Sequence, residues 1–275
     1  MSMEWMLPRH TGPRSKFLDQ WQDHATRVAD YPPHALAKVG DMAAEVIATT
    51  ENLKLAWDHL ANFGGAAAGP NRQTFRDFTR VDAWRELDRL NAELTKGTYR
   101  HGAVLQVPVP KRPGSSGTRP LAIPDIQDRV VGRAVVQILE PLLASRFDKR
   151  SFCRSGLGSW HALAHARQIA EQENRWTWIA EDISGAFDNV PLARLFEVVY
   201  RYIPSVRLLD LIRRSVDGRR KVGLFQGAPL SPVLMNVFLD AMVDRPWRRM
   251  HPDVPLLRYM DDLLILCGPD DDIEG

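Results

Sequence analysis

The chain has 275 residues, of which 44% are hydrophobic, enough for one large folded domain or two ordinary ones. Its net charge of +2, with 25% charged and 8% aromatic residues, is typical of globular proteins and excludes collagen-like, coiled-coil and low-complexity classes. No segment approaches the roughly 18 apolar residues of a membrane span, and residues 1–10 lack the pattern of an export signal. Two widely separated cysteines, Cys153 and Cys267, suit a reducing compartment. We therefore expect a cytoplasmic protein with no membrane partner.

Charge is unevenly distributed along the chain. Residues 100–175 hold twelve Lys or Arg against six Asp or Glu. Two interpretations are open: a surface that contacts phosphate groups, or a solvated helix face.

The N-terminal part is expected to be mainly helical. Residues 1–35 have weak periodicity and are interpreted as an irregular arm or a poorly defined helix. Residues 36–62 have helical periodicity, which ends at the small-residue loop 63–70. A further helix is expected to begin at Asp82 as its N-cap and to end at Gly97.

A basic hairpin is predicted next. Strand-like residues 104–109 and 121–123 enclose a turn-rich segment, 110–120, that carries three cations. A long helix is expected to follow Asp125 as its cap, and another to run from Ser159 to Glu173.

The pattern after this helix is strand, acidic turn, helix. Residues 175–182 are interpreted as a buried strand that ends on Asp182, and residues 191–202 as a helix. Trp176 and Trp178 are interpreted as part of the strand's core. Ser231-Pro232 predicts a helix start.

A tight acidic hairpin is predicted near the C-terminus. Apolar strands at 256–259 and 263–266 flank Asp261 and Asp262. Adjacent carboxylates repel each other unless a cation neutralises them, and such hard oxygen ligands suit Mg²⁺. If the strand bearing Asp182 lies beside this hairpin, three carboxylates converge and can hold two ions about 4 Å apart, as in polymerases and nucleases.

Several ordered segments resemble motifs of reverse transcriptases. Those that resemble the palm motifs are Asp-Ile-Ser-Gly-Ala-Phe-Asp-Asn-Val at 182–190, Phe-Gln-Gly-Ala-Pro-Leu-Ser-Pro at 225–232 and Tyr-Met-Asp-Asp at 259–262. Those that are similar to the fingers of bacterial group II intron and related retroelement enzymes are 119–131, 139–141, 151–154 and 158–161. The likeness covers roughly residues 53–266.

The resemblance implies an α+β fold, the fingers and palm of a right-hand polymerase with an antiparallel palm sheet. The implied division is an N-terminal arm and helix at 1–52, fingers at 53–174 and an incomplete palm at 175–275. Family members continue past the acidic hairpin into further palm elements and a thumb, whereas this chain ends thirteen residues after Asp262. We therefore expect a truncated or split enzyme without a thumb; a second polypeptide, or the remainder of a longer gene product, would supply the missing parts.

The resemblance also assigns metal and sugar-selecting roles. Asp182, Asp261 and Asp262 would hold two Mg²⁺ ions, or Mn²⁺, with help from the backbone carbonyl of Ile183. Phe187 would clash with the 2′-hydroxyl of a ribonucleotide and so select dNTPs; the alternative is an ordinary core aromatic.

Other positions would contact nucleotide or nucleic acid. Gln226 and Gly227 would touch the incoming nucleotide and admit the template backbone, or simply form a loop before a helix. Lys111 and Arg119 would bind the triphosphate, or be solvated charges. Tyr259 would contact nucleic acid, whereas Arg154 and His161 would either contact template phosphate or stabilise the junction of fingers and palm.

Two functions follow as hypotheses. The first is an RNA-directed DNA polymerase that transfers dNMP from dNTP to a DNA or RNA primer on an RNA template. The second is a catalytically silent, maturase-like RNA-binding protein. RNA-directed RNA synthesis is a weaker third hypothesis, because Phe187 is bulky. Intron mobility, diversity generation, retron-like synthesis and antiviral defence all use these motifs, so the sequence does not choose among them.

Overall fold

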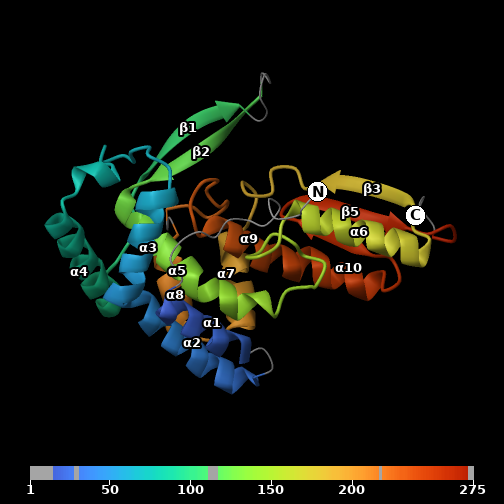
Figure 1. Ribbon diagram of the computed structural model, residues 1–275, viewed down its shortest axis with the longest axis horizontal. Coiled ribbons are helices and arrows are strands. Elements are labelled where there is room, and N and C mark those ends of the chain that lie inside the picture. The colour runs from blue at the N-terminus through green and yellow to red at the C-terminus, as the bar shows by residue number, and fades with distance from the viewer. Residues whose placement is uncertain (1–14, 28–30, 111–116, 217–218, 272–275) are drawn as a thin grey trace.

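The computed structural model describes residues 15–27, 31–110, 117–216 and 219–271. Within these residues the chain forms a helical part, a projecting hairpin and a three-stranded sheet (Figure 1). The helices are α1 (Lys16–Arg27), α2 (Pro33–Ala48), α3 (Thr50–Phe63), the 3₁₀ turn η2 (Phe75–Asp77), α4 (Arg80–Lys96), α5 (Ile126–Ala144), α6 (Ser159–Glu173), α7 (Leu192–Tyr202), α8 (Val206–Arg214), α9 (Ser231–Leu239), the π-helical segment η3 (Asp240–Asp244) and α10 (Arg245–Met250). The strands are β1 (Val104–Pro110), β2 (Thr118–Pro124), β3 (Thr177–Asp182), β4 (Leu256–Tyr259) and β5 (Asp262–Cys267).

Helix α5 is the centre of the main hydrophobic core. It is buried on nearly all sides and packs against α1, α2, α3, α4 and α9. Two of its buried polar side chains are paired: the Asp128 carboxylate accepts from the Tyr99 hydroxyl at 2.6 Å, and Gln137 donates to the Asn52 side chain at 2.8 Å. Such pairing is needed because an unpartnered polar group costs about 1–3 kcal/mol when buried.

The hairpin of β1 and β2 is antiparallel, with Val104 opposite Pro124 and Val109 opposite Arg119. It extends away from the helical part (Figure 1). The main-chain N–H of Ala122, near the base of the hairpin, donates to the Gln226 carbonyl at 2.7 Å. The base is therefore joined to the loop that precedes α9.

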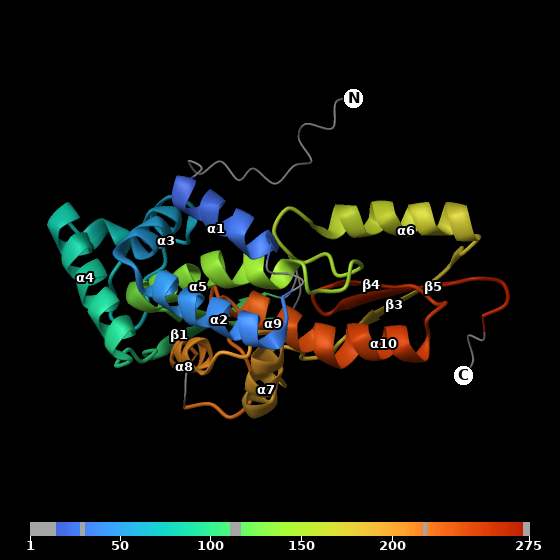
Figure 2. The same cartoon turned by 90° about the horizontal axis from the view of Figure 1, so that it is seen from below.

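The three-stranded sheet is antiparallel and has the order β3-β5-β4. Helix α6 lies along one face of the sheet and α10 along the other (Figure 2). A second, smaller hydrophobic cluster lies between α6 and the strands and includes Phe152, Ala166 and Leu266. The predicted α+β class with an antiparallel sheet is confirmed. The division into fingers and palm, the missing thumb and a partner that supplies it stay predictions.

Several predicted elements are confirmed closely. The helix predicted from Ser159 to Glu173 has those bounds, the basic hairpin forms, and the acidic hairpin joins β4 to β5. The helix that begins at Ser231 is α9.

The helical pattern at 36–62 contains a break that the sequence analysis missed. Thr49 adopts extended backbone angles and separates α2 from α3; its hydroxyl caps α3 by accepting from the N–H of Asn52. The arm at 1–35 contains α1, whose buried Trp21 donates from its indole to the Ile138 carbonyl at 2.9 Å. Helix α8 was not predicted.

Of the two predicted caps, one is wrong and one is confirmed in position. Thr79, not Asp82, is the N-cap of α4, and Asp82 is the third helical residue of a capping box. Asp125 is the N-cap residue of α5 but forms no side-chain capping bond; its carboxylate instead accepts from the N–H of Asn71 at 2.9 Å.

The prediction that β3 is a buried strand is also wrong. Five of its six residues are exposed, and Trp176 and Trp178 are 62% and 41% exposed. The reason is position: among the described strands β3 pairs only with β5, so it is an edge strand of the sheet. An apolar run alone does not distinguish an edge strand from a central one.

Candidate active site

The antiparallel register of β3 and β5 places Asp182 directly opposite Asp262. Residues opposite each other in such a pair have Cβ atoms about 4.5–5.5 Å apart and point to the same face of the sheet. By the alternation of side chains along a strand, this is the face that carries Leu264 and Leu266, which pack toward α6. Two carboxylates from segments 80 residues apart in the chain thus become neighbours.

The turn between β4 and β5 brings Asp261 to the same end of the sheet. Met260 and Asp261 are the only residues between the paired Tyr259 and Asp262, and Met260 has a φ of 57°. A positive φ at this position is what a two-residue hairpin turn requires when it follows the twist of its strands. The N–H of Ile183, which follows β3, donates to the Asp261 carbonyl at 3.1 Å. This bond ties the turn to the end of the strand that carries Asp182.

The three acids also influence one another electrostatically. Burial raises the pKa of Asp261, and the negative charges of Asp182 and Asp262 raise it further. The Arg119 cation on β2 is close enough to lower the same pKa. Within the described residues, none of the three acids has an ion-pair partner within 4 Å.

This donor set fits a hard divalent cation. All its ligands would be oxygens, and Asp182 and Asp262 are exposed, so an ion can reach them. In the part of the chain that the structure describes, no three His, Cys, Asp or Glu side chains are already gathered around one point. The described acids are therefore an open set of like charges and not a preformed cage around an ion.

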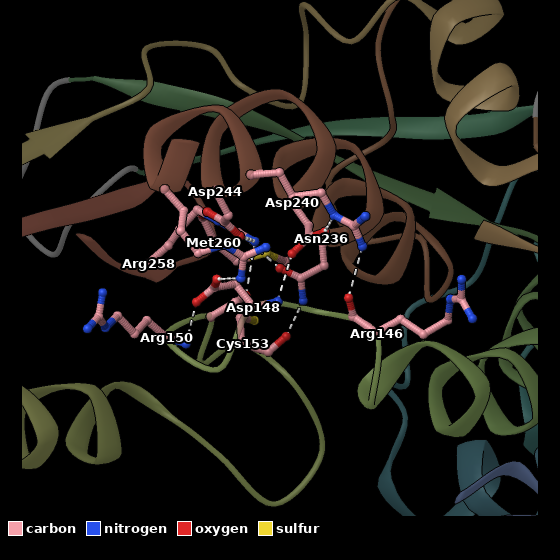
Figure 3. Close-up of polar contacts among 12 residues, drawn as sticks. Arg146, Asp148, Arg150, Cys153, Asn236, Asp240, Asp244, Arg258 and Met260 are labelled. Carbon is pink, nitrogen blue, oxygen red and sulfur yellow. Dashed lines mark hydrogen bonds and ion pairs between the residues drawn. The ribbon is translucent and has the colours of Figure 1, made fainter. Parts of the chain in front are cut away.

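Arg258 is the residue that sequence reasoning missed. Its side chain is only 1% exposed, although it lies in β4 immediately before the acidic turn. It forms a two-pronged pair with Asp244 of η3, at 2.8 and 2.6 Å, and also donates to the side chains of Asn236 and Ser151 (Figure 3). Arg258 points away from the face of Asp182 and Asp262, because it lies one residue out of phase with Tyr259.

Arg258 also holds the turn itself. One of its guanidinium nitrogens donates to the Met260 carbonyl at 3.1 Å, and the backbone of Arg258 bonds to Arg150 and Phe152 on either side of Ser151. A non-glycine residue in the left-handed region costs on the order of 1–3 kcal/mol and persists only when its surroundings hold it there. The buried guanidinium supplies such a restraint on the residue before Asp261. An arginine inside an apolar strand was the available signal, because a buried charge requires a partner.

The loop before α9 packs against the basic hairpin. Gly227 has a φ of 101°, and a Cβ at this position would lie 2.7 Å from the Ala122 carbonyl. Only glycine allows this backbone conformation and this approach to β2. Gln226 and Gly227 are thus placed next to the strand that carries Arg119. Lys111, the other predicted triphosphate ligand, lies outside the described residues.

Ile183 and Phe187 lie in the loop that follows β3. Both are half-buried and pack against the main core. The Phe187 carbonyl accepts from the N–H of Leu224 at 2.7 Å, and the Val190 carbonyl accepts from Gly223 at 2.8 Å. The loop is therefore fixed to the segment that leads to Gln226. Both interpretations of Phe187, gate and core aromatic, are compatible with half-burial.

The predicted nucleic-acid contacts occupy different environments. The Arg154 guanidinium donates to the Ala144 carbonyl at the end of α5, at 2.7 Å. His161 lies in the first turn of α6, and its Nδ1 is buried without a hydrogen-bond partner. Tyr259 is half-buried, and its hydroxyl is hydrogen-bonded to the Cys153 thiol. Burial is the main cause that raises the pKa of Tyr259, and the Cys153 thiol raises it further. Their contact with nucleic acid stays a prediction.

A family model described as reverse transcriptase (RNA-dependent DNA polymerase) matches residues 109–274, which include all three acids. The chain belongs to this family. The resemblance to group II intron and retroelement enzymes is thereby confirmed, because its relatives include intron-encoded proteins.

Two relatives show the extent of the match. Protein YkfC of Escherichia coli (strain K12) is 34% identical over 171 residues, which cover 56% of this chain and 44% of YkfC. Group II intron-encoded protein LtrA of Lactococcus lactis subsp. cremoris is 26% identical over 198 residues, covering 68% of this chain and 32% of LtrA. The reverse transcriptase chain thus spans less than half the length of either relative.

Among solved structures, a chain of the partial Cas6-RT-Cas1–Cas2 complex matches with a TM-score of 0.49 and 21% sequence identity. The match covers 82% of this chain and 38% of that chain. No described helix of the reverse transcriptase chain is long and apolar enough to cross a membrane.

Replacing Arg258 should destabilise the folded protein more than removing an exposed ion pair would. Arg258→Met leaves the Asp244 carboxylate buried without its partner, so we expect the free energy of unfolding to fall by about 3–5 kcal/mol. Urea denaturation measures this change. The matched control is Arg167→Met, which removes an exposed pair with Glu171 and should leave the free energy of unfolding nearly unchanged. Equal effects of the two substitutions would contradict the role assigned to Arg258.

Proposed function

We propose that this chain carries the catalytic centre of an RNA-directed DNA polymerase, which transfers a dNMP unit from a dNTP to a primer 3′-hydroxyl on an RNA template. The observation that supports this proposal best is the pairing of Asp182 with Asp262 beside Asp261, inside a segment that matches the reverse transcriptase family. Residues 53–174 would form the fingers and residues 175–275 the palm.

Asp182, Asp261, Asp262 and the backbone carbonyl of Ile183 would hold two divalent ions, Mg²⁺ or Mn²⁺. When bound, these ions would lower the pKa of the attacking hydroxyl and neutralise charge on the leaving pyrophosphate. The carboxylates would serve only to position the ions, so no side chain is needed as a general base.

The surrounding residues would orient the substrates. Arg119 projects from β2 near the acids, and its planar guanidinium suits a phosphate of the incoming nucleotide; Lys111 would assist. Gln226 would contact the incoming nucleotide, and Gly227 would admit the template backbone. The template or primer would be contacted by Arg154, His161 and Tyr259. A maturase-like protein that only binds RNA is less favoured, because all three carboxylates are present at one end of the sheet.

Primer extension tests the catalytic role of the acids. On an RNA template with dNTPs and Mg²⁺, the chain should extend a DNA or RNA primer. Asp182→Asn or Asp261→Asn should lower the rate by about a thousandfold or more, because several kcal/mol of charge stabilisation depend on the ions. Asp188→Asn is the matched control: Asp188 is exposed, six residues beyond Asp182, and should change the rate less than about threefold.

A binding measurement separates this outcome from a loss of folding. Each variant should bind the primer–template at least as tightly as the unchanged chain, since a negative charge is removed. Absence of extension by the unchanged chain even when a thumb is supplied, or full extension by Asp261→Asn, would contradict the proposal. Binding that persists with no extension by any form would select the RNA-binding alternative.

Sugar selection tests the proposed gate. Phe187→Ala should lower the ratio of kcat/KM for dNTP to that for rNTP by about tenfold or more, because the ring would no longer exclude the 2′-hydroxyl. Phe196→Ala is the control, since Phe196 also packs partly buried against the main core but lies on α7. An unchanged ratio in Phe187→Ala, with extension activity retained, would show that Phe187 is only a core aromatic.

A further inference from the structure

A cavity of about 380 Å³ lies away from the acids and is lined mainly by arginines. It is enclosed by the ends of α5 and α7 and by η3 and α10. Its lining consists of Arg146, Arg201, Tyr202, Ala241, Arg245, Arg248 and Arg249. The cavity shares no residue with the proposed catalytic site.

The charges around the cavity do not balance. Arg245 pairs with Asp240 at 2.7 Å and Arg248 with Asp148 at 2.5 Å. Among the described residues, Arg201 and Arg249 form no ion pair, and both are exposed. The C-terminal ends of α5, α7 and α10 each add at most about half a negative charge. The cavity therefore keeps a net positive charge.

Part of this cation cluster is held rigidly. The Arg245 guanidinium lies 4.7 Å from the centre of the Tyr202 ring and donates to the Arg146 carbonyl at 3.0 Å. The Tyr202 hydroxyl bonds to the buried Asp240. Burial lowers the pKa of Arg146, and the nearby Arg245 cation lowers it further. Two like charges, those of Arg146 and Arg245, are thus held near each other on one side of the cavity.

We propose that this arginine cavity binds the phosphodiester backbone of RNA, outside the catalytic site. Guanidinium groups match phosphate oxygens in a two-pronged geometry and are less strongly hydrated than ammonium groups. RNA is favoured over an acidic protein segment, because the proposed function, on which this inference rests, already requires RNA as the template, and sequence-independent binding of nucleic acid is made by Arg and Lys contacts to phosphates. The cavity would give a reverse transcriptase a second, sequence-independent hold on its RNA.

Fluorescence anisotropy with a labelled 20-nucleotide single-stranded RNA tests the proposal on the whole chain. Arg201→Glu combined with Arg249→Glu should weaken binding tenfold or more at 0.1 M salt. The matched control reverses the same number of charges at Arg85 and Arg167, whose side chains are 78% and 76% exposed and lie on α4 and α6. The control accounts for the change in net charge and should weaken binding less than threefold.

A milder variant guards against misfolding. Arg201→Gln combined with Arg249→Gln should keep the thermal unfolding temperature and lower the slope of log affinity against log salt by about 1.4, since each phosphate contact contributes about 0.7 on a single strand. Equal binding by both Gln and Glu variants and the unchanged chain would overturn the proposal.

Two competitors identify the source of the anion. Poly-glutamate at matched charge should not displace the RNA, and neither should cytidine monophosphate at matched phosphate concentration. If poly-glutamate binding depends on Arg201 and Arg249 while RNA binding does not, the cavity takes an acidic protein and the proposal fails. If the mononucleotide displaces RNA from the unchanged chain but not from the Gln variant, the cavity binds free phosphate groups and the proposal fails.

Discussion

The antiparallel pairing of β3 with β5 is the constraint on which the site depends. It sets Asp182 against Asp262, a register that repulsion between two carboxylates opposes. Apolar pairs farther along, such as Trp178 with Leu266 and Ile179 with Ile265, favour the same register. A slip of one residue would turn every side chain of β3 to the other face. The register is therefore kept by the strand as a whole, at a local cost where the acids meet.

A second set of charges is buried beneath the acidic turn and restrains its backbone. Arg258 and Asp244 neutralise each other, and the guanidinium also fixes the Met260 carbonyl one residue before Asp261. The two sets differ in kind. The buried pair has both charges and nearly all its hydrogen bonds supplied by the protein, whereas the three acids near the surface have no cationic partner within bonding distance among the described residues. The uncompensated negative charge of the three acids therefore favours binding of a cation from solution.

Much of this arrangement could be predicted from local sequence. The motifs located the three acids, and the helix Ser159–Glu173 follows from a periodic segment that stops at Asn174, which adopts the left-handed conformation of a helix end. The exposure of β3 could not be predicted, because it depends on which strands pair. The partner of Arg258 is likewise a matter of tertiary contact, since Asp244 lies on a separate helix. The break at Thr49 was missed because apolar periodicity continues through it.

Diffraction from crystals grown with Mn²⁺ and a dNTP tests the central claim most directly, because anomalous scattering locates the metal independently of any assay. The account predicts a Mn²⁺ peak with carboxylate oxygens of Asp182 and of Asp261 or Asp262 at about 2–2.5 Å, and an unchanged β3–β5 register. Well-ordered density for all three side chains with no metal between them, at Mn²⁺ concentrations that saturate related polymerases, would contradict it.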